Sequence, residues 1–139
     1  MQEDERVEGA VSLWVGVSPS PDALENYVEM DYSMNNLSRL SPLAKDFKTG
    51  WYDHDFMEAD MPEKSTRSLG DLLRGCSYDS IIIPKFVKLF GDLLPEEANA
   101  FVLLYDFQHH GSPWPGAGVG GPVKLRYMGS ITVEMPWPD

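Results

Sequence analysis

The fold of this chain is decided by the stretch VSLWVGV, residues 11–17. Four aliphatic residues alternate there with a serine, a tryptophan and a glycine, and a period of two is typical of a β-strand. The nine residues before this stretch are charged and are expected to be flexible. The sequence therefore predicts a flexible acidic N-terminus over residues 1–9 and a folded part that begins with a strand.

Several helices and one short strand are expected after this first strand. Ser20-Pro21-Asp22 and Ser41-Pro42 are helix-start signals, because a serine caps a helix and proline suits its first turn. A small helix is predicted around residues 69–73 and ends at Gly75. An apolar stripe over residues 86–94 predicts a further helix, which starts at Pro84 because proline disfavours helix in the residue before it. Residues 51–58 are predicted to form a short strand.

The C-terminal third predicts two more strands. Residues 101–105 are apolar on both faces, which suits a central strand, and residues 108–122 form a Gly/Pro-rich loop. From residue 123 to 134 apolar and polar residues alternate, and Gly129 lies in phase with the apolar face, where a bend or bulge is expected. We therefore predict an α+β fold, a single domain over residues 10–139 with a mainly antiparallel sheet of about four strands packed with helices.

The charge of the chain argues against several classes of ligand. Its 139 residues include 22 Asp and Glu against 11 Lys and Arg, a formal net charge of −11. A negative field repels phosphate backbones and anionic lipids, so direct binding to nucleic acid or membrane is not expected. The same field would attract a basic protein, although net charge also serves solubility alone.

Other features exclude chemistry rather than suggest it. Cys76 is the one cysteine and lies among apolar residues at helical spacing, which predicts a core position rather than a catalytic thiol. The run GAGVGG at 116–121 matches a dinucleotide fingerprint in its letters, but a strand and not a helix is expected after it, so no cofactor is predicted. No apolar run is long enough to span a membrane and no signal peptide is evident, so we expect a cytoplasmic protein.

The densest polar group is the acidic stretch that contains Asp53, Asp55, Glu58 and Asp60. On a strand, Asp53 and Asp55 point to one side, while Tyr52 and Phe56 point to the other. Such carboxylates could face a basic partner, hold a hard cation, act as an acid/base pair, or simply form a solvated face. The residues alone leave these alternatives open.

Tryptophans supply the remaining indication of an interface. Trp14, Trp51, Trp114 and Trp137 are widely spaced, and Trp114 lies on the Gly/Pro-rich loop. An exposed tryptophan beside acidic residues has the composition of an interface hot spot. A tryptophan folded back over the sheet is the alternative.

The chain resembles a known family in these same segments. The strand Leu13-Trp14-Val15-Gly16 is followed by the Ser/Pro-started helix with Tyr27, and then by the aspartate-aromatic stretch from Asp46 to Glu58. Together they look like the immunity protein 22 family of bacterial polymorphic toxin systems, over roughly residues 11–134. The resemblance implies a small cytoplasmic α+β protein that binds a cognate toxin domain. Its matching positions here are Trp14, Gly16, Tyr52, Asp53, Asp55 and Glu58.

The leading hypothesis is a non-enzymatic immunity protein that binds a basic toxin domain, with nucleases among the candidates. The residues expected at its acidic, aromatic surface are Trp14, Trp51, Tyr52, Asp53, Asp55, Glu58, Asp60 and Trp114. No metal and no cofactor are part of this hypothesis. The alternative is a small metal-dependent or acid/base enzyme that uses Asp53, Asp55 and Glu58.

Overall fold

The described part of the chain is built around an antiparallel sheet of four strands in the order β2-β5-β1-β6. The computed structural model describes residues 6–29, 41–49, 52, 54–111 and 122–134. The strands of the sheet are β1 (Arg6–Val17), β2 (Met57–Asp60), β5 (Ala100–Phe107) and β6 (Lys124–Thr132). A separate two-stranded sheet pairs β3 (Thr66–Ser68) with β4 (Leu93–Ala98). The predicted α+β fold with a mainly antiparallel sheet is confirmed.

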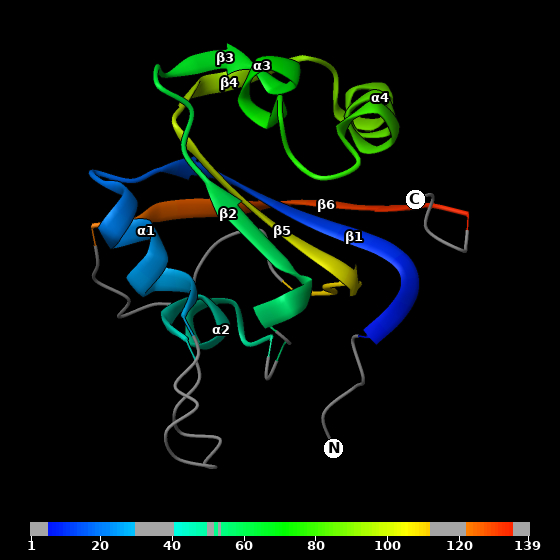
Figure 1. Cartoon of the computed structure of the whole chain (residues 1–139), viewed down its shortest axis with the longest axis horizontal. Coiled ribbons are helices and arrows are strands. Elements are labelled where there is room, and N and C mark those ends of the chain that lie inside the picture. The colour runs from blue at the N-terminus through cyan, green and yellow to red at the C-terminus, as the bar shows by residue number, and fades with distance from the viewer. Residues whose placement is uncertain (1–5, 30–40, 50–51, 53, 112–121, 135–139) are drawn as a thin grey trace.

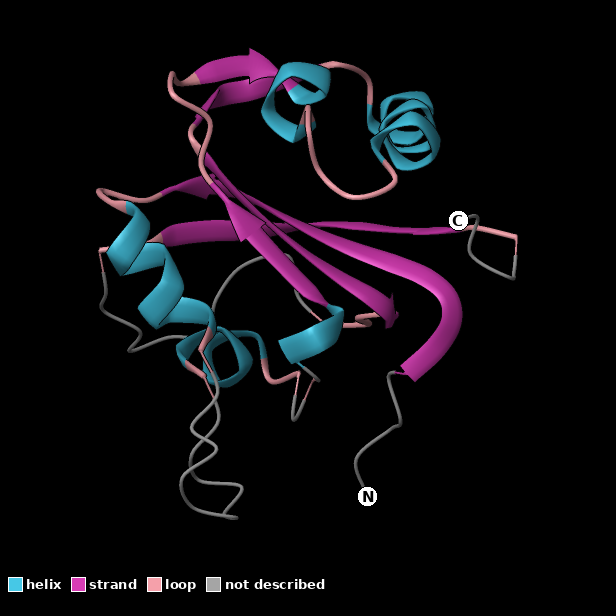
Figure 2. Cartoon of the chain, viewed as in Figure 1, coloured by secondary structure: helices cyan, strands magenta, loops and turns pink. Residues whose placement is uncertain are grey.

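Each face of the main sheet carries its own layer and its own core. Helices α1 (Pro21–Val28) and α2 (Pro42–Phe47) lie below the sheet in Figure 1, while β3, β4, α3 (Leu69–Leu73) and α4 (Asp79–Phe90) lie above it. Figure 2 shows the same three layers, with the sheet between two sets of helices. Two separate clusters of buried apolar residues fill the two spaces. No helix in the described ranges is both long and apolar enough to cross a membrane.

Strand β1 is buried on both faces because it is one of the two central strands. Val11, Leu13 and Val15 belong to the upper core, and Trp14 belongs to the lower core. The buried hydroxyl of Ser12 donates to the Phe107 carbonyl oxygen at 2.8 Å, which removes the cost of placing a polar group there. The predicted strand is confirmed, and the alternation within it separates two cores rather than a core from solvent.

The two serine-proline signals begin α1 and α2 as predicted. Ser20 and Ser41 are the N-cap residues, and each side-chain oxygen accepts a hydrogen bond from the backbone nitrogen three residues later, at 3.1 Å in both cases. The two helices are tied together where the Tyr27 hydroxyl donates to Asp46 Oδ2 at 2.6 Å. This pair holds the two helices of the lower layer together.

A bulge in β6 changes which core its residues enter. Gly129 pairs with Leu13 and Tyr127 pairs with Trp14, so Met128 is the extra residue. Val123, Leu125 and Tyr127 therefore pack in the lower core, whereas Ile131 and Val133 pack in the upper core. The sequence predicted a bend or bulge at Gly129, and this is confirmed. Its placement of all five apolar residues on one face is wrong, because one extra residue reverses the alternation.

The predicted strand over residues 51–58 is wrong in its first part. A 3₁₀ helix, η2 (His54–Phe56), precedes β2, which begins only at Met57. The carboxylates that share one strand face are therefore Glu58 and Asp60, which pair with Leu103 and Phe101 of β5. Asp53 lies outside the described residues, and Asp55 belongs to the 3₁₀ helix.

The segment from 79 to 98 also differs from the prediction. Helix α4 begins at Asp79 and contains Pro84, so residues 81–83 are helical and not extended. Burial of Ile82 and Phe86 in the upper core outweighs the cost of the proline, whose missing N–H removes one helical hydrogen bond. Leu93 and Leu94 leave the predicted helix and begin β4.

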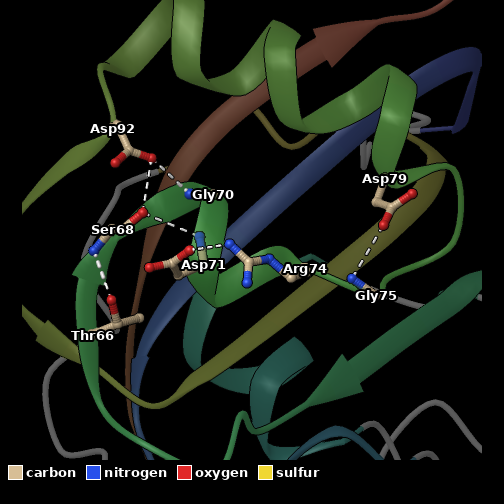
Figure 3. A network of polar contacts seen from close by, with 8 residues as sticks. All are labelled: Thr66, Ser68, Gly70, Asp71, Arg74, Gly75, Asp79 and Asp92. Atoms are coloured by element: carbon tan, nitrogen blue, oxygen red, sulfur yellow. Dashed lines mark hydrogen bonds and ion pairs between the residues drawn. The ribbon is translucent and has the colours of Figure 1, made fainter.

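A network of short polar contacts holds α3 between β3 and α4 (Figure 3). The Ser68 hydroxyl caps α3 by accepting from Asp71 N at 3.1 Å, and it also donates to Asp92 Oδ1 at 3.1 Å. The same Asp92 oxygen accepts from Gly70 N at 2.8 Å. In the turn after α3, Gly75 N donates to Asp79 Oδ2 at 3.2 Å. The Asp92 contacts hold the start of α3 against the connection from α4 to β4, and the Gly75–Asp79 bond lies in the turn between α3 and α4, which borders the candidate site.

Candidate partner-binding site

Two of the aromatic residues predicted at the partner surface are core residues. Trp14 is 0% exposed and Tyr52 is 3% exposed, which leaves neither ring available to a partner. Trp14 packs against Phe47 and Tyr127, with ring centroids 5.8 and 4.9 Å away. Sequence reasoning could not see this, because the second core that receives them is built by the distant helices α1 and α2. Trp51, Asp53 and Trp114 lie outside the described residues.

The three described carboxylates of the acidic stretch occupy different positions. Asp55 is exposed on the 3₁₀ helix, and Asp60 is exposed at the end of the edge strand β2. Glu58 is half-buried and points toward the upper layer. The structure thus brings Asp55 and Glu58 to one pocket, whereas Asp60 lies outside its lining.

Glu58 ties the sheet to the turn between α3 and α4. Its Oε1 accepts a hydrogen bond from the Tyr105 hydroxyl at 2.7 Å. The backbone nitrogen of Ser77 donates to both carboxylate oxygens, at 3.0 and 3.2 Å. Both donors are neutral, so these bonds fix the carboxylate without cancelling its charge. Glu58 therefore has a positioning role inside the protein, in addition to any contact with a partner.

A pocket of about 410 Å³ opens beside this carboxylate. It is lined by Asp55, Phe56, Met57, Glu58, Ser77, Tyr78 and Tyr105. Phe56 is 48% exposed and Tyr78 is 38% exposed, which makes them two of the large apolar side chains that the structure leaves open to solvent. Exposed aromatic residues beside carboxylates have the composition of a protein-binding hot spot.

Sequence reasoning missed both of these aromatic residues. The sequence predicts Phe56 on the strand face opposite Asp53 and Asp55, but the residue lies on a 3₁₀ helix and is about half exposed. The sequence predicts no role for Tyr78, although it lies in the short polar run 77–80 at the start of α4, where an aromatic residue has little core to enter. An aromatic residue within such a polar run is the feature of the sequence that could have predicted an exposed Tyr78.

The backbone at Tyr78 is in the left-handed region, with φ of 58°. A non-glycine residue in that conformation costs about 1–2 kcal/mol, and glycine is the usual solution. Tyr78 is the N-cap of α4 and its side chain makes no cap hydrogen bond. The backbone at this position would suit glycine better than tyrosine, and the Tyr78 ring contacts the ring of Tyr105 edge to face.

Burial and the Glu58 charge shape the acid–base behaviour next to the pocket. The pKa of the Tyr105 hydroxyl is raised, first by burial and then by its hydrogen bond to Glu58 and the charge of that carboxylate. Burial, followed by the charges of Glu58 and Asp79, raises the pKa of the Cys76 thiol to about 12. The thiol is buried and remains protonated at neutral pH, as the sequence predicted for a core cysteine.

A second, larger cavity of about 620 Å³ lies between β4 and β6. One wall carries Glu96 and Glu97, and the other carries Lys124 and Arg126, above a mostly apolar floor. Asp46 also lines this cavity, so three carboxylates face two basic side chains there, whereas the smaller pocket is lined by two carboxylates and by no basic side chain. The smaller pocket therefore fits the predicted acidic partner surface better.

The alternative of a metal site or acid/base pair finds no cluster in the described parts of the chain. No group of three or more His, Cys, Asp or Glu residues there could hold a metal ion. Of the three carboxylates of that hypothesis, Glu58 is held by hydrogen bonds within the protein and Asp55 lies on the 3₁₀ helix. Asp53 lies outside the described residues.

The family model for immunity protein 22 matches residues 11–134, which is most of the chain. The chain belongs to the immunity protein 22 family. Membership gives it a toxin-neutralising role in general terms, with a toxin as the partner. Proteins of such families are generally not enzymes. No curated protein and no solved structure matches the chain. The resemblance inferred from the sequence is confirmed, and the surface that meets the toxin must be argued from the structure.

Proposed function

We propose that this protein neutralises its toxin by stoichiometric binding, through a surface centred on Asp55, Phe56, Glu58 and Tyr78, with Asp60 at its edge. The observation that carries this proposal is the open aromatic pocket beside a fixed carboxylate. Trp51, Asp53 and Trp114 remain candidates for the same surface, while the buried Trp14 and Tyr52 are withdrawn as contacts.

The charge of the chain supports a basic partner. At a formal net charge of −11, the protein attracts cationic surfaces over a distance set by the salt concentration. Complementary charge speeds the encounter, and exposed aromatic anchors then slow dissociation. A toxin domain that acts on nucleic acid needs a basic cleft, so a nuclease in the cytoplasm is the partner that we favour.

The test is co-expression with any toxin domain that is encoded in the neighbouring reading frames, followed by growth measurement and co-purification. We expect growth rescue and a 1:1 complex. Failure of the wild-type chain to rescue growth against that toxin would overturn the proposed function. Rescue at amounts of protein far below those of the toxin would point to catalysis instead.

Point variants then test the location of the surface. Asp55→Lys and Phe56→Ala should each weaken the complex about tenfold or more, as expected for residues at an interface hot spot. The matched controls are Glu97→Lys and Leu93→Ala, which change an exposed acid and an exposed leucine on β4 in the same way. A complex that loses affinity in the controls but not in the pocket variants would place the toxin elsewhere.

A further inference from the structure

The pocket beside Glu58 holds a negative charge in a defined position. The carboxylate accepts hydrogen bonds from the Tyr105 hydroxyl and the Ser77 amide, and neither donor is charged. The raised pKa values of Cys76 and Tyr105 both include a contribution from this charge. A cation that enters the pocket thus meets a carboxylate that is already oriented and partly desolvated, so little ordering is needed on binding.

Aromatic rings form the rest of the pocket. Tyr78 and Tyr105 meet edge to face, with ring centroids 6.2 Å apart and an interplanar angle of 67°. Phe56 lines the same pocket and is about half exposed. Ring faces attract cations, and they attract arginine more often than lysine because the flat guanidinium group can stack on them.

The conformation of Tyr78 indicates that its ring has a use. The residue keeps a left-handed backbone that glycine would adopt without strain. Strain of this kind concentrates at binding and catalytic sites, where the side chain is needed in one place. The Glu58 bonds to Ser77 hold the turn, and the turn presents the Tyr78 ring at the pocket.

We propose that this pocket receives one arginine side chain of the partner, with its guanidinium group against Glu58 and between the rings of Tyr78 and Phe56. This rests on the proposed function for the source of the arginine, but the recognition itself depends only on the pocket. A volume of about 410 Å³ leaves room for one such side chain. Asp55 at the pocket lining adds a second negative charge.

The direct test uses the purified protein and a small probe, N-acetyl-arginine amide, followed by ¹H–¹⁵N NMR. We expect saturable shifts of the Ser77 and Tyr78 amides with half-saturation on the order of 1–10 mM. N-acetyl-citrulline amide has nearly the same shape without the charge and should cause no saturable shift. Equal shifts from both probes, or none up to about 50 mM, would overturn the inference. Tighter binding of the matching lysine amide would overturn the choice of arginine.

A backbone-neutral variant separates recognition from folding. Tyr78→Gly removes the ring and relieves the left-handed strain, so the melting temperature should stay level or rise while arginine binding falls at least fivefold. Lys48→Gly is the matched control, since Lys48 has φ of 56° at the end of α2 and is not among the residues that line the pocket. Unchanged arginine binding in Tyr78→Gly would refute the role of the ring.

Formation of the toxin complex and binding of the arginine amide, measured separately, distinguish failure of this inference from failure of the proposed function. If the toxin complex forms and Tyr78→Gly leaves it intact, the proposed function stands and the arginine pocket falls. If arginine amide binds but no toxin complex forms, the pocket stands as a cation site and the proposed function falls.

Discussion

Removal of the Glu58 side chain should loosen the contact between β2 and the turn that follows α3. The variant Glu58→Ala lacks the carboxylate that accepts hydrogen bonds from two donors, Ser77 N and the Tyr105 hydroxyl. A hydrogen bond to a charged group contributes about 1.5–3 kcal/mol, so a simple sum is about 3–6 kcal/mol. Two details of the structure reduce this figure.

Each donor has a substitute partner once the carboxylate is gone. The Ser77 amide lies at the surface and can bind water. The Tyr105 hydroxyl has the Ser77 carbonyl oxygen 3.2 Å away. Because neither group is left buried and unsatisfied, we expect a loss of about 1.5–3 kcal/mol in the free energy of unfolding, which is about half of the simple sum.

Urea unfolding measures this loss directly. With a slope of about 1–3 kcal/mol per M for a small protein, the midpoint should fall by roughly 1 M. A double-mutant cycle with Tyr105→Phe should give a coupling energy of about 0.5–1.5 kcal/mol, since the two side chains share one bond. Glu97→Ala, at an exposed position of β4, is the control and should lie within about 0.5 kcal/mol of wild type.

Two results would contradict this reasoning. The first is a loss below about 0.5 kcal/mol in Glu58→Ala, which would mean that the carboxylate does not hold the turn. The second is a coupling energy of zero with Tyr105→Phe, which would mean that the two side chains act independently.

Two further predictions concern the lower core and the central strands. Gly16→Ala should lower the free energy of unfolding in urea by at least about 2 kcal/mol, because its Cβ would lie 2.0 Å from the Lys124 carbonyl oxygen. The control is Gly70→Ala, where the atom nearest to the new Cβ is a side-chain oxygen at 3.2 Å. Equal losses in the two variants would refute the argument. Burial raises the pKa of Asp46, although its bond from Tyr27 opposes this, so the native state keeps a proton that the unfolded chain has lost. Stability conferred by Asp46 should therefore fall as pH rises from the ordinary Asp pKa of about 3.9 through the raised native value, and Asp46→Asn should remove that fall. Unfolding free energies of both proteins across this range measure it, and a parallel pH dependence would contradict the sign.

Local signals in the sequence predicted the elements that local chemistry controls. The two serine-proline caps, the first strand, the buried Cys76 and the bulge at Gly129 all follow from neighbouring residues and are confirmed. β4 could not be predicted in this way, because its sequence LLPEEA lacks strand character. It is a strand because β3 pairs with it, and because the Arg67 side chain donates to the Leu94 and Pro95 carbonyl oxygens.

The candidate site was predicted in its charge but not in its aromatic residues. Asp55 and Glu58 were found because carboxylates close in sequence stay close in space. Phe56 is predicted on a strand face opposite Asp53 and Asp55, whereas it lies on a 3₁₀ helix with its side chain about half exposed. Trp14 was assigned to the surface because the sequence does not show that the sheet is covered on both sides. Which face of an aromatic residue is covered depends on segments far along the chain.

The pairing of β1 has a consequence for when the main sheet can form. Both neighbours of β1 come late in the chain, from Ala100–Phe107 and Lys124–Thr132. During synthesis, β1 is made well before these two partners, and the delay at about 5–20 residues per second is roughly 5–20 s. Contacts between such distant segments also form slowly. A new molecule can therefore complete its main sheet only after β6 has been synthesised, and any function that needs this sheet starts no earlier.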